Sequence, residues 1–404
     1  MSITICIPAY RAGRFIAATL QSVQAQTFTD YRVCIQVDPH ESDHTCNEDD
    51  TWRAIQPFLD DERFFAEANS ERLGWDANIR YLLTSVHSTY YVILPHDDLW
   101  VPDYLELLLD QLDSDPGALL AYADMCTIGG SPPFRKGVAV AHSSSRFEQV
   151  MDFLLQGAEA MPWRGLTRSS ALDSCSFPVD HLGGFAVECE YALQLLVTGP
   201  AIHVPRPLYF KRIHPQGVLS ASRERQLSKT RGDLEGAWKI HMHEMTSLVD
   251  KLSNRLNEVE THSLRVALHA AMLRRYQQAV HSVLPLSEVA AVKRSIESLL
   301  PHRSQLDSRI ASRLHLLLYR HGKATSEPHA DAEKRAHIAY LLDAQHAEAC
   351  MALAAWNKTK GDLLSAYRYW AEAEALTPGN PLPREAISQI SAALTLEHEI
   401  SKDG

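Results

Sequence analysis

The first hundred residues alternate between short apolar runs and amphipathic stretches, and this alternation constrains the fold more than any other feature. The apolar runs are rich in β-branched residues and read as strands buried on both faces: 3–10, 31–38, 63–69 and 90–98. The stretches between them space their apolar side chains at a helical period: 12–26, 51–59 and 74–86. Strand–helix–strand alternation requires crossover connections. It therefore predicts an α/β fold with a mostly parallel sheet flanked by helices.

Three segments that carry polar side chains stand where three of these strands end. They are Pro8–Arg11, Asp38 and the adjacent pair Asp97 and Asp98. Ligands of parallel sheets bind at the carboxyl ends of the strands, so we expect these residues to lie along one edge of the sheet.

The pair Asp97 and Asp98 ends a buried strand with two like charges, whose repulsion disfavours ionising both. Either the two carboxylates cap and solvate a loop, or a cation sits between them. Mg²⁺ and Mn²⁺ prefer oxygen ligands, typically one or two carboxylates together with phosphate oxygens. The pair therefore indicates a site for a divalent cation that accompanies a phosphorylated ligand.

The character of the chain changes near residue 220, where strand signals give way to long amphipathic helical stretches. We therefore predict two domains, an α/β domain over 1–220 and an all-α helical domain over 221–404. Within the second, residues 347–381 resemble one tetratricopeptide repeat, with the turn at Gly361 and Asp362. Ala366 and Tyr367 fall on its second helix, and Pro378 closes the unit. This segment either completes the helical domain as a hairpin or forms a groove that binds a partner.

Composition excludes several classes of function. Residues 1–220 carry 15 Lys and Arg against 28 Asp and Glu, and the remainder carries 24 against 22. An acidic α/β domain argues against binding to nucleic acid, which needs a basic surface. We find no apolar run long enough to span a membrane and no signal peptide, so a cytoplasmic location is expected. The histidine-containing segments 40–44 and 241–244 lack metalloprotease spacing, and we predict no zinc site from them.

Four segments, in this order, resemble glycosyltransferase family 2, whose nucleotide-sugar-binding fold is called GT-A. They are the entry 3–38, the Arg/Gly-then-Asn helix at 71–83, the acidic region 95–106 and the closing segment 185–220. The resemblance covers residues 1–220. It implies that a sugar is moved, with inversion, from a nucleotide-sugar donor to a hydroxyl of a saccharide, glycolipid or protein acceptor.

The resemblance also implies how the donor is bound. The carboxylate of Asp38 would accept the imide N–H of uracil or thymine, which selects a UDP- or dTDP-sugar. Pro8, Ala9 and Tyr10 would contact the base and ribose, and Arg72 the base or phosphates. The residues assigned to the donor are Pro8, Ala9, Tyr10, Arg11, Asp38, Arg72, Asp97, Lys211 and Arg212.

The resemblance also implies which residues bind the cation and which one acts as the catalytic base. Asp98 would contact Mn²⁺ or Mg²⁺, Asp97 would share the ion or hold the ribose, and His214 would be a further ligand or a diphosphate donor. The base that deprotonates the acceptor hydroxyl corresponds to Glu188, with Glu190 as the competitor.

The helical domain is expected to bind a partner protein, a second protomer or the acceptor, with membrane association left open. The rival hypothesis is a non-catalytic protein that binds a nucleotide sugar and uses the helical domain for interaction. It is favoured by Pro95, which stands where the family often has another acid. A nucleotidyltransferase is disfavoured because no glycine-rich, lysine-bearing loop follows the first strand.

Overall fold

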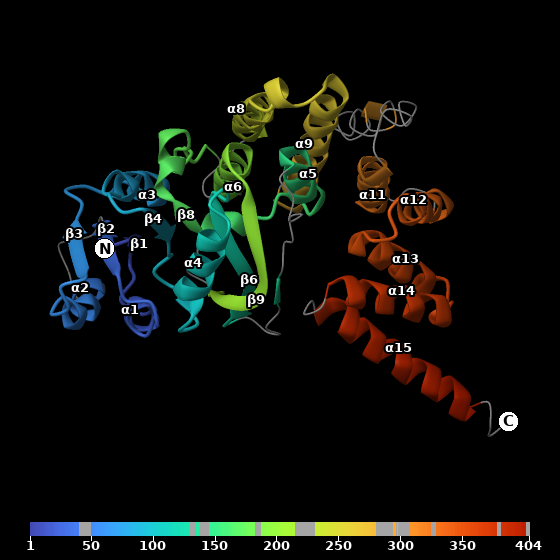
Figure 1. Cartoon of the computed structure of the whole chain (residues 1–404), viewed down its shortest axis with the longest axis horizontal. Helices are drawn as coiled ribbons and strands as arrows, with labels where there is room; N and C mark the ends of the chain where they lie inside the picture. Colours follow the sequence, from blue (N-terminus) through green and yellow to red (C-terminus); the bar gives the residue numbers. More distant parts are fainter. Residues whose placement is uncertain are drawn as a thin grey trace. The chain divides into compact units, whose positions relative to one another are not determined.

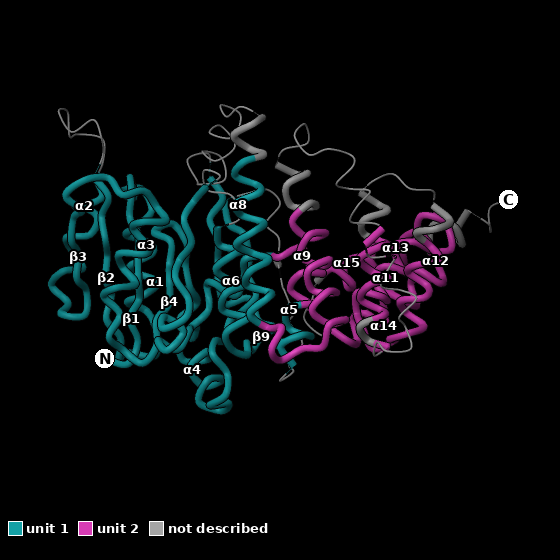
Figure 2. The backbone as a smooth tube through the Cα atoms, turned by 90° about the horizontal axis from the view of Figure 1, so that it is seen from above, with its two compact units in different colours: residues 1–150, 159–251 teal, residues 151–158, 252–404 magenta. Residues whose placement is uncertain are grey.

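The structure is a computed structural model of the 404-residue chain. It describes residues 1–39, 50–129, 135–136, 145–181, 187–214, 231–279, 294–295, 297, 308–324, 329–377 and 381–400. Two compact units are distinguished: residues 1–150 with 159–251, and residues 151–158 with 252–404 (Figure 2).

The first unit begins with four parallel strands, as the sequence predicts (Figure 1). They are β1 (Ile3–Ala9), β2 (Tyr31–Val37), β3 (Phe64–Ala68) and β4 (Tyr90–Ile93). Strand β1 pairs in parallel with β2 and β4, and β2 pairs with β3. All four residues of β4 and most of β1 are buried, which explains why both read as continuous apolar runs.

Helices connect these strands as expected: α1 (Ile16–Gln24), α2 (Thr51–Ile55) and α3 (Trp75–Thr84). The stretch predicted as one helix over 51–59 is an α-helix followed by a 3₁₀ turn over Gln56–Phe58. Proline at position 57 accounts for the change, because its ring and its missing N–H oppose continuation of an α-helix.

The second half of the sheet is mixed. Its elements are β5 (Leu99–Trp100), α4 (Tyr104–Ser114), β6 (Leu120–Ile128), β7 (Arg135–Lys136), β8 (Leu166–Arg168) and β9 (Ala201–Arg212). The strand order is β3-β2-β1-β4-β8-β6-β9-β5, with β7 paired to β6. Strand β8 is antiparallel to both β4 and β6, whereas β9 is parallel to β6. The α/β class is confirmed. Only the half of the sheet from β3 to β4 is purely parallel, and the other half is mixed.

Several helical elements complete the first unit. They are the first part of α5 (Arg146–Leu155), α6 (Val187–Thr198), α8 (Arg231–Asp250) and the 3₁₀ turns Pro162–Arg164 and Ser169–Asp173. Helix α8 packs against α6 and groups with this unit, although the sequence assigned it to the helical domain. The predicted boundary at residue 220 lies outside the described residues and stays a prediction.

The second unit is helical beyond residue 252. It comprises the 3₁₀ turn Ser253–Arg255, α9 (Glu258–Ala279), α11 (Ser308–Ala324), α12 (His329–Leu342), α13 (Ala347–Thr359), α14 (Leu363–Leu376) and α15 (Pro381–Ile400). From α11 onward each helix packs on the next (Figure 1). In the part of the chain that the structure describes, no helix is both long and apolar enough to cross a membrane.

The turn between α13 and α14 follows the sequence closely. Gly361 has a φ of 81°, a conformation that favours glycine, and the Asp362 side chain accepts a hydrogen bond from the N–H of Ser365 at 3.0 Å. The hairpin is therefore present. Because Pro378 lies outside the described residues, the tetratricopeptide resemblance stays a prediction.

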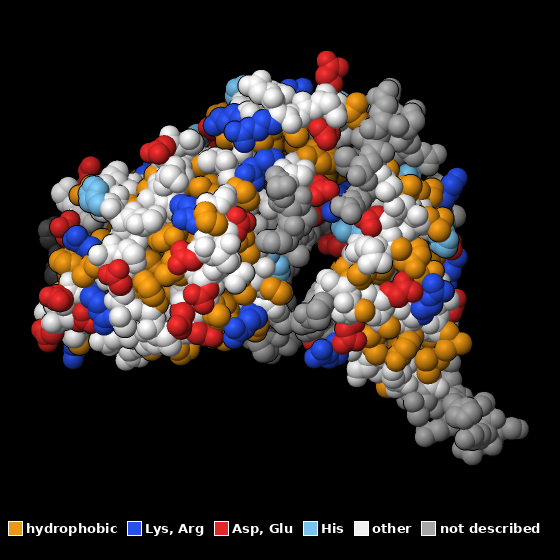
Figure 3. All heavy atoms as spheres, in the orientation of Figure 1, with side chains coloured by type: hydrophobic (Ala, Val, Ile, Leu, Met, Phe, Trp, Pro, Cys, Tyr) orange, Lys and Arg blue, Asp and Glu red, His pale blue; other side chains and the backbone are white. Residues whose placement is uncertain are grey.

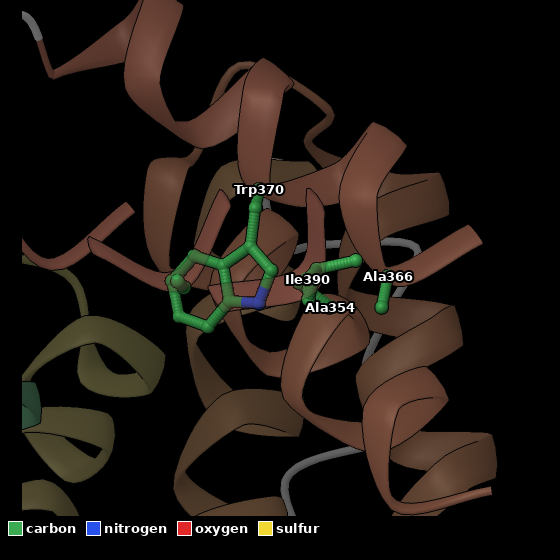
Figure 4. Packing of buried hydrophobic residues seen from close by; sticks show 5 residues of the cluster. Ala354, Ala366, Trp370 and Ile390 are labelled. Atoms are coloured by element: carbon green, nitrogen blue, oxygen red, sulfur yellow. The ribbon is translucent and has the colours of Figure 1, made fainter. Parts of the chain in front are cut away.

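Small residues let these helices approach one another around a tryptophan. The indole of Trp370 packs with Ala354 of α13, Ala366 of α14 and Ile390 of α15 (Figure 4). Trp370 is 7% exposed, whereas Leu364, on the same helix, is 73% exposed.

We expect Trp370→Ala to destabilise the helical unit by about 3–5 kcal/mol, because the neighbouring alanines cannot fill the cavity that the indole leaves. Denaturant unfolding of the full chain, followed by circular dichroism, would measure the loss. Leu364→Ala is the matched control and should change the free energy of unfolding by less than about 1 kcal/mol. Equal effects of the two substitutions would contradict this packing.

Candidate functional site

The ends of β1, β2 and β4 meet at one edge of the sheet. The N–H of Asp38 donates to the carbonyl of Ala9 at 2.8 Å, and His96 Nδ1 lies 3.1 Å from the carbonyl of Pro8. The N–H of Leu94 donates to the carbonyl of Cys6. Three segments that the sequence singled out thus lie side by side.

Asp38 is buried and holds the loop that leads into α3. Its Oδ1 accepts from Asn69 Nδ2 at 2.6 Å and from the N–H of Leu73 at 3.1 Å, and its Oδ2 accepts from the N–H of Gly74 at 2.8 Å. A carboxylate offers about four acceptor positions, so these three donors from the described residues leave one position on Oδ2. Asp38 can therefore support the loop and still accept one N–H from a ligand.

Tyr10 forms an aromatic surface flanked by two cations. The guanidinium of Arg72 lies 4.4 Å from the centre of the Tyr10 ring, and that of Arg11 lies 5.6 Å from it. Arg11 adopts a φ of 48°, which is uncommon for a residue other than glycine. Such backbone conformations cluster at ligand sites.

Asp98 is buried and points into the protein. Its Oδ2 accepts from the hydroxyl of Tyr209 at 2.6 Å and its Oδ1 from the N–H of Arg212 at 2.9 Å. Arg164 Nε lies 3.8 Å from the same Oδ2. Burial, followed by repulsion from Asp97, raises the pKa of Asp98 to about 6, although Arg164 opposes the shift.

Asp97, in contrast, meets His214. The Oδ2 of Asp97 lies 2.9 Å from His214 Nε2, and the backbone carbonyl of Asp97 accepts from Arg212 Nε at 3.0 Å. The His214 ring packs on Phe15 with the ring centres 4.5 Å apart. His214 Nδ1 is buried and has no hydrogen-bond partner among the described residues.

The two candidate bases on α6 face different neighbours. Lys211 interacts electrostatically with Glu188, Asp98 and Asp97. Burial lowers the pKa of Lys211 and nearby Arg164 lowers it further, while these three carboxylates oppose the shift. Glu190 is buried instead against His241 of α8, with Glu190 Oε2 and His241 Nδ1 3.1 Å apart.

The site around Asp97 suits a divalent cation that arrives with phosphate oxygens. Asp97 and His214 already lie together, and Asp98 is adjacent, but its oxygens serve Tyr209 and Arg212. In the described ranges, these residues do not form a group of three that could hold an ion alone. Carboxylate and imidazole ligands completed by a diphosphate fit the chemistry of Mg²⁺ and Mn²⁺.

Arg164 and Tyr209 belong to this site and were not identified from the sequence. Arg164 interacts electrostatically with both Asp98 and Glu188, and its guanidinium lies 4.6 Å from the Trp163 ring and 5.6 Å from the Tyr209 ring. The one available signal was a single arginine within the largely apolar run 161–166.

Comparison with known proteins agrees with this fold. Residues 4–164 match the model of the family described as glycosyl transferase family 2. A crystal structure of S. aureus TarS matches with a TM-score of 0.54 and 12% identity, over 85% of this chain and 53% of that one. The chain thus spans about half the length of that TarS chain. TarS 1-349 in complex with UDP-GlcNAc matches with a TM-score of 0.56 and 12% identity, over 81% of this chain and 93% of that one.

The raised pKa of Asp98 predicts a pH dependence of stability in buffer free of divalent cations. The folded state holds the proton more tightly than the unfolded state, whose pKa is about 4. The contribution of Asp98 to the free energy of unfolding is therefore fully present below pH about 4. It falls by about 3 kcal/mol as the pH rises to about 6. Denaturant unfolding between these pH values should show this slope in the wild type and not in Asp98→Asn. A constant difference between the two proteins would contradict it.

Proposed function

We propose that the chain, whose residues 4–164 match the model of glycosyl transferase family 2, is a glycosyltransferase that moves a sugar from a UDP- or dTDP-linked donor to a hydroxyl group. The observation that carries the proposal is that Asp97, Asp98 and Glu188 all interact electrostatically with Lys211. The carboxylates proposed for the metal ion and for the base thus act on the same lysine, whose positive charge can neutralise a diphosphate.

The edge formed by Ala9, Tyr10 and Asp38 would bind the nucleoside. The open acceptor position on Asp38 would take the imide N–H of uracil or thymine, while the Tyr10 ring and Arg72 would contact the base or phosphates. Support comes from the TarS relative of this fold, whose structure contains UDP-GlcNAc.

Asp97 and His214 would hold a divalent cation at the diphosphate, with Asp98 positioning the Asp97 turn. When bound, such an ion polarises the phosphate oxygens and lowers the cost of charge on the departing diphosphate. Lys211 and Arg212 would add positive charge at the same place, because both lie where β9 ends beside Asp97 and Asp98.

Glu188 would be the base. It would accept the proton of the acceptor hydroxyl as that oxygen bonds to the anomeric carbon and the bond from this carbon to the diphosphate breaks. One displacement inverts the anomeric configuration. Glu190 is disfavoured for this role because it is buried against His241.

The acceptor is proposed to be a hydroxyl of a saccharide, glycolipid or protein. The helical unit would bind that acceptor, a partner protein or a second protomer. A purely non-catalytic protein is not favoured, because three carboxylates interact electrostatically with Lys211 despite proline at position 95.

Thermal unfolding with nucleotides and Mn²⁺ tests the donor. We expect UDP to raise the melting temperature more than CDP, because cytosine lacks the imide N–H that Asp38 would accept. Equal shifts with UDP and CDP, or a larger shift with GDP, would overturn the role given to Asp38.

Release of the nucleoside diphosphate from the stabilising donor sugar tests the base. Glu188→Gln should lower turnover by about 10²–10⁴-fold, because a positioned general base typically contributes that much. Donor affinity should not change. Glu62→Gln, at an exposed position, is the matched control and should retain full turnover. Undiminished turnover in Glu188→Gln would show that another group is the base.

A further inference from the structure

A second cluster of metal-ligating side chains lies between α6 and α8. Glu190 of α6 meets His241 and Glu244 of α8, and one ligand atom from each lies within 4.8 Å of the others. His181 adds a fourth group, with its Nε2 3.2 Å from Glu244 Oε1. Two imidazoles and two carboxylates thus come from three separate segments.

The distances match a tetrahedral zinc site. Zinc bonds to imidazole nitrogen and carboxylate oxygen at about 2.0–2.2 Å, which places adjacent ligand atoms about 3.3 Å apart. Glu190 Oε2 and His241 Nδ1 are 3.1 Å apart, and Glu244 Oε1 and His181 Nε2 are 3.2 Å apart. Each of these two pairs therefore has the spacing of one edge of such a tetrahedron.

Burial makes a cation favourable there. Glu190 and His241 are both buried, and Glu190 Oε2 makes no hydrogen bond within the described residues. The same is true of Glu244 Oε2. A buried carboxylate oxygen without a hydrogen bond is costly, and a cation coordinated by the carboxylates of Glu190 and Glu244 would offset that cost.

The segment that carries His181 is held in place independently of the cluster. Arg80 Nη1 of α3 donates to the carbonyl of Pro178 at 2.7 Å, and the N–H of Asp180 donates to Asp76 Oδ2 at 3.1 Å. Trp75 Nε1 also donates to Asp180 Oδ2 at 3.2 Å. These anchors hold the segment in place while His181 Nε2 lies 3.2 Å from Glu244 Oε1.

We propose that Glu190, His241, Glu244 and His181 bind one Zn²⁺ that cross-links α6, α8 and the segment 175–181. All four positions are protein ligands, so the site is closed and structural. It would fix the start of α6, two residues from Glu188. Its ligands are all protein side chains, whereas the cation proposed at Asp97 depends on phosphate oxygens of the donor.

Zinc content of the purified full-length chain tests the proposal. After dialysis against a weak chelator, we expect one zinc per chain by elemental analysis. Stripping with a strong chelator should lower the melting temperature, and added Zn²⁺ alone should restore it. Glu244→Gln and His241→Gln should each reduce bound zinc at least tenfold.

Two controls locate the ion. His243→Gln changes an exposed histidine on the same helix and should keep the zinc. Asp97→Asn should also keep it, because that residue belongs to the other site. A wild-type chain without zinc whose melting temperature does not respond to Zn²⁺ would overturn the proposal, as would retention of zinc in His241→Gln. If a variant fails to fold, the melting temperature of the wild type with and without Zn²⁺ still tests the proposal. Zinc content and melting temperature do not depend on transferase activity.

Discussion

The buried carboxylate of Asp98 is the constraint on which the site depends. It ties the turn after β4 to β9 through the hydroxyl of Tyr209 and the N–H of Arg212. A buried charge is tolerated only when it is paired and hydrogen-bonded, and Arg164 supplies the opposing charge. Because β9 is held there, His214 reaches Asp97 two residues beyond the strand's end.

The mixed half of the sheet makes this arrangement possible. Strand β9 runs parallel to β6 and antiparallel to β5, so its carboxyl end lies beside the residues that follow β4. Its register on β6 shifts around Asp124, which pairs with Pro207. Proline cannot donate to a neighbouring strand, which accounts for an irregular ladder at that point. On the face shown in Figure 3, acidic and basic side chains are interspersed over this unit.

Helix α6 is almost completely buried, so its side chains contact neighbours on more than one side. Residues two apart on a helix point to different sides, so Glu188 interacts with Arg164 and Lys211 while Glu190 meets α8. The same geometry explains why α8 groups with the sheet unit and not with the later helices. Packing of α8 against α6 completes a polar cluster that neither helix has alone.

The sequence by itself determined the four parallel strands, the helices between them and the meeting of Ala9, Asp38 and Asp97 at one edge. It could do so because the spacing of apolar residues and the direction of each strand are local properties. Together they dictate where the carboxyl ends of the strands lie. It could not find Arg164 or Tyr209, or choose between Glu188 and Glu190. Those depend on contacts between residues tens of positions apart, which leave no periodic signal. Only the tertiary structure decided that Asp98 faces inward and that Asp97 meets His214. It also placed Glu190 and His181 beside His241 and Glu244, in a segment from which the sequence alone predicts no metal site.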